Sequence, residues 1–356
     1  MRYLYTLSPS FLWLFLKDKS LEEALKRMVL APKNPAELFE VALSRAKKVA
    51  KKGRGLTGIK RLEERRIEVA RAYVVERLKD IALRSVFLED LHDFHRELAE
   101  LAINADEYKK CLSLIYGAVR IINKVAAEQR WKVRSALTGG EAARYRRQFF
   151  GRLRSILEDL EDCMIKVRRY QLELLKLPNV DPYLDSLIIA GPPNVGKSSL
   201  VRAISRAKPE VREYPFTTKS IIVGHIETGE KKIQVLDTPG LLDRPLEERN
   251  PIERQAILAM KHLRGVIVFL FDPTETCGFP LDYQLRVYRE IKEHFGEMPF
   301  MLLANKIDIA SPKDVGRVLR LLGKEKKDLI LISALRNVNI DYFMEKALSF
   351  FTLKKP

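Results

Sequence analysis

The chain has 356 residues, of which 46% are hydrophobic, and it carries 64 Lys and Arg against 47 Asp and Glu. This length predicts two domains, and the apolar content excludes an intrinsically disordered chain. Its cysteines are few and scattered, which excludes a disulfide framework and a paired-cysteine metal site and favours a reducing, cytoplasmic environment. The apolar run at 11–16 is far shorter than the about 20 residues that span a bilayer, so we expect neither a membrane span nor a signal peptide.

The positive charge is concentrated in the first half of the chain. Residues 1–180 carry 37 Lys and Arg against 24 Asp and Glu, a net charge of +13, whereas residues 181–356 carry 27 against 23, a net charge of +4. A polyanion would therefore be attracted to the first half by long-range electrostatics and counterion release. A solubilising surface is the alternative, but the split favours a nucleic acid partner.

Helical periodicity dominates residues 1–178, which we predict to form an all-α antiparallel bundle. The predicted long helices span 34–52, 57–83, 105–137 and 140–174, with short helices at 19–30 and 87–103. Glycines at 53, 55 and 58 and at 139–140 predict turns between them. Pro178 and Pro182 end the last helix and predict a linker.

Residues 179–356 alternate between apolar runs and helical segments, which predicts an α/β P-loop GTPase domain. The predicted strands are 186–190, 220–224, 233–236, 265–271, 300–304 and 329–332, and the predicted helices lie near 197–207, 251–263, 281–295, 313–322 and 338–350. This alternation predicts a mostly parallel sheet with helices on both faces. Residues 220–236 have the pattern of a hairpin that turns at Thr228 and Gly229, so we expect one antiparallel edge.

A phosphate-binding loop follows the first strand of this domain. Gly191–Ser198 fits the pattern G-x-x-x-x-G-K-S/T and opens a helix, whose N-terminus and backbone N–H groups attract phosphate. Lys197 would neutralise the β- and γ-phosphates, and Ser198 would bind Mg²⁺. The residues predicted to bind nucleotide here are Asn194, Val195, Gly196, Lys197, Ser198 and Ser199.

Two later segments predict that the base is guanine. Asn305, Lys306 and Asp308 follow strand 300–304 in the pattern N-K-x-D. We expect a buried Asp308 carboxylate to accept the N1–H and 2-amino hydrogens of guanine, a pair of donors that adenine lacks. Backbone N–H groups of the segment that follows the last strand would close over the base, and its residues are Ser333, Ala334 and Leu335. The sequence therefore predicts GTP and GDP as ligands.

Between these segments lies a predicted metal and γ-phosphate site. Asp237 ends strand 233–236 and would hold the Mg²⁺ shell, while the N–H of Gly240 would face the γ-phosphate. We choose Thr218 over Thr217 as the hydroxyl for the same metal, so the predicted metal ligands are Ser198, Thr218 and Asp237. The predicted catalytic residues are Lys197, Thr218, Asn194 and Gly240.

The residue after Gly240 is a Leu, where many GTPases have a Gln that orients the attacking water. Neither Leu241 nor Leu242 can polarise water. We therefore expect slow intrinsic hydrolysis and a stimulating element from elsewhere, an activator or an ion.

In these segments the chain resembles the Obg-like translation GTPases, and most closely the nucleolar GTP-binding protein family. The resemblance is carried by GPPNVGKSS at 191–199, PFTTKSIIVGH at 215–225, VLDTPGLLDRPLEERNPIE at 235–253 and ANKID at 304–308, and it extends to 106–129 and to LPNVDP at 177–182. It implies GTP hydrolysis with Mg²⁺, a helical domain lodged in ribosomal RNA and a role in maturation of the large ribosomal subunit. Nucleolar members continue well beyond the GTPase core, so a chain that ends at Pro356 implies a short, archaeal-type form.

The resemblance also bears on the stimulating element. Similar GTPases that carry Asn at the position of Asn194 coordinate K⁺ with it, and such an ion can replace the charge of an arginine finger. The alternative is that Asn194 only caps the turn of the loop. K⁺ is therefore a possible cofactor beside GTP, GDP and Mg²⁺.

Basic residues surround the two predicted glycine turns of the bundle. In an up-down-up-down bundle the first and third turns lie at the same end, so they would form one basic tip. The residues predicted to bind RNA there are Lys51, Lys52, Arg54, Lys60, Arg61, Arg130, Lys132, Arg134, Arg144, Arg146 and Arg147. We expect large-subunit ribosomal RNA and pre-ribosomal particles as partners, no DNA, no membrane, and a monomer off the ribosome.

Other functions remain as alternatives at this point. Protein-targeting GTPases also place a helical bundle before the nucleotide domain, but their DTAGR and TKxD patterns are missing here, as is the C-terminal cysteine motif of tRNA-modification GTPases. A nucleotide-locked RNA-binding protein without turnover is a further alternative because of Leu241.

Overall fold

The computed structural model describes residues 21–352 except 206–209, 215–219, 229–230 and 239, and these residues form two compact units. Among the described residues, the first unit contains those from 21 to 90 and from 102 to 175, and the second contains those from 91 to 101 and from 176 to 352. The predicted single boundary between residues 178 and 179 places 91–101 and 176–178 in the first domain. In the structure these residues belong to the second unit.

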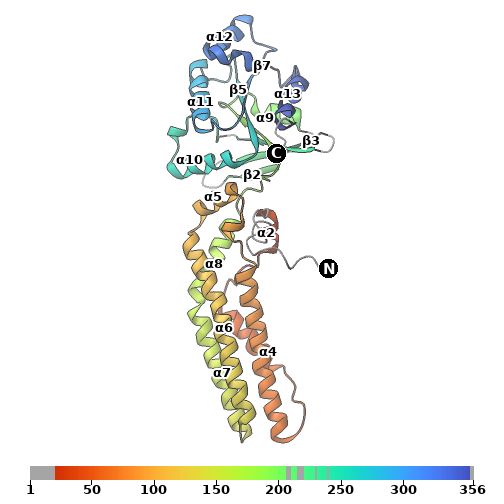
Figure 1. Ribbon diagram of the computed structural model, residues 1–356, viewed down its shortest axis with the longest axis vertical. Helices are drawn as coiled ribbons and strands as arrows, with labels where there is room; N and C mark the ends of the chain where they lie inside the picture. Colours follow the sequence, from red (N-terminus) through yellow and green to blue (C-terminus); the bar gives the residue numbers. More distant parts are fainter. Residues whose placement is uncertain (1–20, 206–209, 215–219, 229–230, 239, 353–356) are drawn as a thin grey trace, which may run out of the picture. The chain divides into compact units, whose positions relative to one another are not determined.

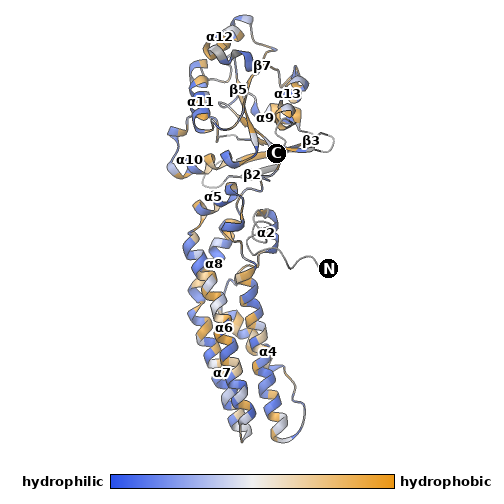
Figure 2. Cartoon of the chain, viewed as in Figure 1, coloured by the Kyte–Doolittle hydropathy of each residue, from blue (hydrophilic) through white to orange (hydrophobic). Residues whose placement is uncertain are grey.

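The first unit is a helical bundle (Figure 1). Its α-helices are α2 (Leu21–Arg27), α3 (Ala36–Lys47), α4 (Gly55–Leu83), α6 (Ala105–Ser135), α7 (Gly139–Asp159) and α8 (Glu161–Leu174), and a 3₁₀ turn, η1 (Leu88–Asp90), follows α4. Side chains cap two of the long helices: Asn104 accepts a hydrogen bond from the N–H of Glu107 at the start of α6, and Thr138 accepts one from the N–H of Glu141 at the start of α7. The long helices lie side by side, as Figure 2 shows, and each buries apolar residues such as Leu78, Ile122 and Leu153.

The helix predicted over 140–174 is interrupted at Leu160. The N–H of this residue bonds to the carbonyl of Leu157, three residues earlier, and separates α7 from α8. Leu157, Leu160 and Met164 are all buried, so the apolar face continues across the interruption. Periodicity alone therefore could not reveal it.

The second unit is built on a seven-stranded sheet with the order β2-β3-β4-β1-β5-β6-β7. Its strands are β1 (Asp185–Ala190), β2 (Glu210–Glu213), β3 (Ser220–Thr228), β4 (Lys231–Asp237), β5 (Gly265–Phe271), β6 (Phe300–Ala304) and β7 (Leu329–Leu331). β1 pairs in parallel with β4 and β5, whereas β3 pairs antiparallel with β2 and β4. The mostly parallel sheet with one antiparallel edge is thus confirmed, and β2 is a strand that the sequence pattern missed.

Helices cover both faces of this sheet. They are α9 (Lys197–Ile204), α10 (Pro251–Leu258), α11 (Leu281–His294), α12 (Pro312–Leu322) and α13 (Ile340–Thr352), with 3₁₀ turns η2 (Leu246–Glu248), η3 (Ala259–His262) and η4 (Gly323–Asp328). Val201 of α9 and Phe343 of α13 share one buried cluster with the strands. On the other face, Tyr288 of α11 packs against the rings of Phe269 and Phe271. The phosphate-loop and base motifs follow β1, β6 and β7 at the carboxyl edge of the sheet, where ligands bind in such folds.

Residues 91–101 include most of α5 (Asp93–Ala102), which packs within the second unit. Nε2 of His262, in η3, lies 2.7 Å from Oε1 of Glu97, and Nε2 of His95 lies 3.3 Å from the carbonyl oxygen of Pro178. Burial lowers the pKa of His95 to about 4. Among the described residues, no helix combines the length and apolar character needed to cross a bilayer.

Candidate nucleotide-binding site

The phosphate loop connects β1 to α9 through backbone conformations that need glycine. Gly191 has a φ of 135° and Gly196 a φ of 103°, both in the left-handed region. A Cβ on Gly196 would lie 2.2 Å from Nδ2 of Asn305, and one on Gly191 would lie 2.6 Å from the carbonyl oxygen of Leu270. Asn194 also has a positive φ, 61°, which Asn tolerates better than most residues. The backbone conformation therefore explains an Asn at this position without any bound ion.

Lys197 is held inside the loop. Its side chain is buried, and its Nζ donates hydrogen bonds to the carbonyl oxygens of Gly191 at 2.7 Å and Pro192 at 2.9 Å. Burial lowers the pKa of Lys197, and the negative charges of Asp243 and Asp237 oppose that effect. The loop therefore presents a desolvated cation beside its backbone N–H groups, which suits a phosphate.

Two of the three predicted metal ligands lie together. Oγ of Ser198 donates a hydrogen bond of 2.6 Å to Oδ2 of Asp237, at the end of β4. Asp237 is fully buried; burial raises its pKa, and the hydrogen bond from Ser198 partly offsets this. Within the described residues its Oδ1 has no hydrogen-bond partner, and a hydroxyl and a carboxylate are the oxygen ligands that Mg²⁺ prefers. These two residues therefore fit Mg²⁺, whereas Thr218 lies outside the described residues.

The predicted base-binding segments lie beside the phosphate loop. Asn305 joins them, because its Nδ2 donates to the carbonyl oxygen of Val195 at 2.8 Å and its Oδ1 accepts from the N–H of Ala334 at 2.9 Å. Oγ of Ser333, which is fully buried, donates to Oδ1 of Asp308 at 2.7 Å. The structure thus brings the loop after β6 and the loop after β7 to one place.

One expectation about the base site was wrong. The Asp308 carboxylate is exposed, not buried, because Asp308 lies in the turn after β6 rather than within the strand. Leu335 is also exposed, at 77%, which leaves its side chain in solvent. The protein therefore does not desolvate the Asp308 carboxylate in advance.

Comparisons with known proteins match most of the chain. The family model described as the NOG1 N-terminal helical domain matches residues 26–181, and the model described as nucleolar GTP-binding protein 1 matches residues 251–308. An uncharacterized protein of Methanocaldococcus jannaschii is 38% identical over 286 residues, which are 79% of this chain and 80% of that protein.

The chain belongs to the nucleolar GTP-binding protein 1 family.

Eukaryotic members of the family are longer. Nucleolar GTP-binding protein 1 of Saccharomyces cerevisiae is 33% identical over 290 residues, which cover 80% of this chain but only 44% of the yeast protein. A solved structure of putative nucleolar GTP-binding protein 1 from Plasmodium falciparum is 34% identical, with a TM-score of 0.43, and covers 49% of this chain and 89% of that one. This chain thus spans less than half of the yeast relative. Its second unit, a mostly parallel sheet with a phosphate loop after β1, has the fold of a P-loop GTPase domain.

Sequence reasoning missed Asp272, which lies within the part matched by the family model. This carboxylate is fully buried; its Oδ2 accepts hydrogen bonds from Nζ of Lys306 at 2.7 Å and from the N–H of Cys277 at 2.8 Å, and its Oδ1 accepts one from Oγ1 of Thr274 at 2.6 Å. Burial alone would raise the pKa of Asp272, but the hydrogen bonds from Lys306 and Thr274 outweigh it and lower the pKa. Asp272 therefore fixes Lys306 of the N-K-x-D segment. Sequence reasoning could have found Asp272 from its position directly after strand β5, at the carboxyl edge of the sheet.

The two basic turns of the family's helical domain do converge at one end of the bundle (Figure 1). Nζ of Lys60, in α4, donates a hydrogen bond of 2.9 Å to the carbonyl oxygen of Arg134, near the end of α6. We call the residues 48–61 and 130–147 the basic tip.

The basic tip contains two kinds of cation. Four pair with acidic residues of the bundle: Arg130 with Glu64 and Glu68, Arg134 with Glu64, Arg146 with Glu63, and Lys132 with Glu128. Of the other residues predicted to bind RNA, six are exposed and have no ion pair within the described part of the chain; they are Lys51, Lys52, Arg54, Arg61, Arg144 and Arg147. The six exposed cations are the stronger candidates for binding phosphates, because they give up no internal partner.

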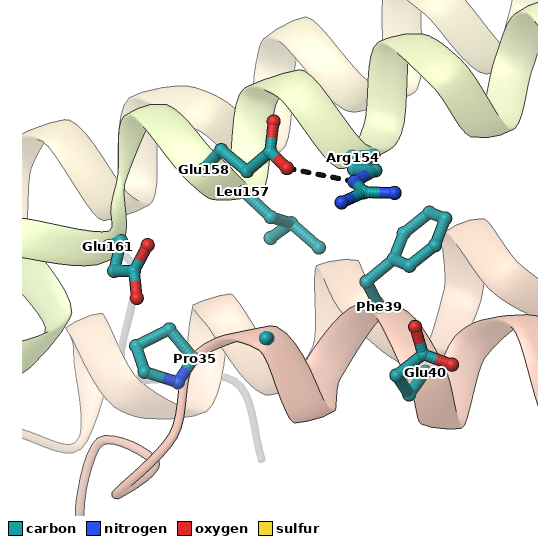
Figure 3. Close-up of a pocket in the computed structure, with 8 residues that line it drawn as sticks. Pro35, Phe39, Glu40, Arg154, Leu157, Glu158 and Glu161 are labelled. Carbon is teal, nitrogen blue, oxygen red and sulfur yellow. Dashed lines mark hydrogen bonds and ion pairs between the residues drawn. The ribbon is translucent and has the colours of Figure 1, made fainter.

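A pocket elsewhere in the helical unit does not match a nucleotide. It lies between α3 and α7, where Phe39 and Leu157 face each other and Arg154 pairs with Glu158 (Figure 3). Its volume of about 80 Å³ suits a few water molecules.

Proposed function

We propose that this chain binds GTP and GDP with Mg²⁺, hydrolyses GTP, and docks on large-subunit ribosomal RNA in pre-ribosomal particles through its helical unit. The observation that carries the nucleotide part is the meeting of three motifs through Asn305, which bonds to both the phosphate loop and the loop after β7. The name of the relatives, nucleolar GTP-binding protein 1, supports the same ligand and a ribosomal setting. For this chain we propose the cytoplasm as the site of action, and a monomer off the particle.

In this proposal each residue has a limited task. Lys197 compensates the charge of the β- and γ-phosphates, and Ser198 and Asp237 hold Mg²⁺, which neutralises charge on the same oxygens. Gly240, with a φ of 77°, turns the chain after β4, and its N–H would bind the γ-phosphate. Leu241 and Leu242 are both fully buried, so neither reaches an attacking water. Intrinsic hydrolysis is therefore slow.

A Lys197→Ala variant tests nucleotide binding. Loss of a charge-assisted contact to phosphate should weaken GTP affinity by about 1.5–3 kcal/mol, which corresponds to about 10- to 150-fold. Titration of a fluorescent GTP analogue in the presence of Mg²⁺ measures this change. Lys313→Ala, at an exposed lysine of α12, is the matched control, and equal affinity of the two variants would remove Lys197 from the site.

The choice of monovalent cation tests Asn194. We expect faster single-turnover hydrolysis in K⁺ than in Na⁺ at equal ionic strength, because a bound K⁺ would stabilise charge that no Gln or Arg compensates. Asn194→Ala should abolish the difference while GDP affinity stays near that of the wild type. Equal wild-type rates in both salts would contradict the K⁺ hypothesis and favour an activator on the ribosomal particle.

A further inference from the structure

The segment between β4 and α10 contains a buried charged cluster that the nucleotide motifs do not include. The side chain of Arg249 is completely buried. Its Nη2 donates to the carbonyl oxygen of Leu241 at 2.8 Å and to Oδ1 of Asp243 at 3.0 Å, and its Nη1 pairs with Oε1 of Glu253. One cation is thus shared between two carboxylates and a backbone carbonyl.

The start of α10 fixes one side of this cluster. Asn250 caps the helix by accepting a hydrogen bond of 2.7 Å from the N–H of Glu253, and Pro251 occupies its first turn. The cap fixes the backbone of Glu253, and Arg249 links the Glu253 carboxylate to the Leu241 carbonyl and the Asp243 carboxylate.

Backbone contacts connect the cluster to the phosphate loop. The N–H of Gly191 donates to the carbonyl oxygen of Leu242 at 2.9 Å, and the carbonyl of Gly191 accepts the hydrogen bond from Lys197. Since Leu241 and Leu242 are both fully buried, this segment has no freedom to shift without disturbing the loop. The position of the Leu241 carbonyl, set by Arg249, therefore bears on the position of Gly191.

The charges in the cluster also bear on Lys197. Asp243 is 9% exposed, and its negative charge is one of those that oppose the burial-induced lowering of the Lys197 pKa. Without Arg249, the buried carboxylate of Asp243 would have no cation beside it. An unpaired buried charge destabilises the protein, and pairing with another cation would lower that free-energy cost. Lys197 is a buried cation within its electrostatic reach, and a Lys197 paired with Asp243 would be less available to phosphate.

We propose that Arg249 is a positioning residue of the phosphate site: it holds the Leu241 carbonyl and the Asp243 carboxylate in place, so that Lys197 stays available to the nucleotide. This role rests on the nucleotide binding proposed above. Arg suits it because its planar guanidinium donates to several acceptors at once, which the ammonium of Lys does less well.

The test is a comparison of Arg249→Met with Arg254→Met, an exposed arginine on α10. Affinity for a fluorescent GTP analogue with Mg²⁺ is measured by titration, and folding is checked by thermal unfolding. Arg249→Met should lose about tenfold or more in GTP affinity, and Arg254→Met should match the wild type. Wild-type affinity in a folded Arg249→Met variant would overturn the role of Arg249 alone, whereas a wild-type chain that binds no GTP analogue would contradict the proposed function.

The double variant that combines Asp243→Asn with Arg249→Met distinguishes a role of Arg249 in positioning the phosphate site from a role in packing alone. A neutral amide no longer competes for Lys197, so we expect part of the GTP affinity lost in Arg249→Met to return, while the Leu241 carbonyl still lacks its donor. A double variant as weak as Arg249→Met would overturn the proposal, since a residue needed only for packing cannot be rescued in this way. If Arg249→Met does not fold, the same pair is made with Arg249→Gln, which removes the cation but keeps a hydrogen-bond donor for the Leu241 carbonyl. Its partial loss should likewise be restored by Asp243→Asn, and absence of restoration overturns the proposal.

Discussion

Asp308→Asn is expected to shift nucleotide preference from guanine toward xanthine. The carboxylate of Asp308 would accept two hydrogen bonds from the N1–H and 2-amino group of guanine, and an amide cannot accept both. Loss of two charge-assisted hydrogen bonds should weaken GTP binding about 100-fold or more. Xanthine carries a carbonyl at position 2, which the Asn amide can bind as a donor, so XTP affinity should rise. Competition titrations with GTP, XTP and ATP measure the three affinities.

The structure supplies a control for this experiment. Asp282→Asn removes an exposed carboxylate in the first turn of α11 and should leave GTP affinity unchanged. Because Asp308 is exposed and Asn can still accept the hydrogen bond from Ser333, the variant should remain folded. Guanine preference retained in folded Asp308→Asn would show that the base is recognised elsewhere.

Neutralising the exposed cations of the basic tip is expected to abolish binding to large-subunit particles without loss of GTP hydrolysis. The six changed residues are Lys51, Lys52, Arg54, Arg61, Arg144 and Arg147, each replaced by Gln. For every phosphate that the variant no longer neutralises, the slope of log K against log salt concentration should fall by about 0.9 on duplex RNA or about 0.7 on single strands. Sedimentation with large-subunit particles across a salt series measures the slope, and single-turnover assays measure hydrolysis.

A control variant carries the same change of net charge at other places. It replaces six exposed cations outside the tip by Gln: Lys33, Lys79, Lys110, Arg254, Arg289 and Lys313. If net charge alone attracts the particle, both variants will weaken binding equally and the tip is not the contact surface. The paired cations Arg130, Arg134 and Arg146 are left intact, because removing them would leave buried or half-buried glutamates without partners.

The sequence by itself determined the elements whose signals are local. Strands β5 and β6 begin and end at the predicted residues, because a buried parallel strand is a continuous apolar run with polar or turn residues at both ends. The phosphate loop and the N-K-x-D segment could be placed at strand ends for the same reason. The positive φ angles of Gly191 and Gly196 are also a local requirement of the loop, whereas the close approach of Leu270 and Asn305 to these glycines depends on the packing of other strands.

The tertiary structure alone decided which distant residues meet. The division of the basic tip into paired and exposed cations depends on the register between α4 and α6, which places Glu64 beside Arg130 and Arg134 and which helical periodicity does not specify. Asp272 became a partner of Lys306 only when the loops after β5 and β6 packed together, and Arg249 became a partner of Asp243 only when the segment between β4 and α10 folded back on itself. The packing of α5 within the second unit followed from contacts such as that of Glu97 with His262, 165 positions apart in the chain. Such pairs depend on the three-dimensional approach of side chains, which a one-dimensional pattern of polarity does not contain.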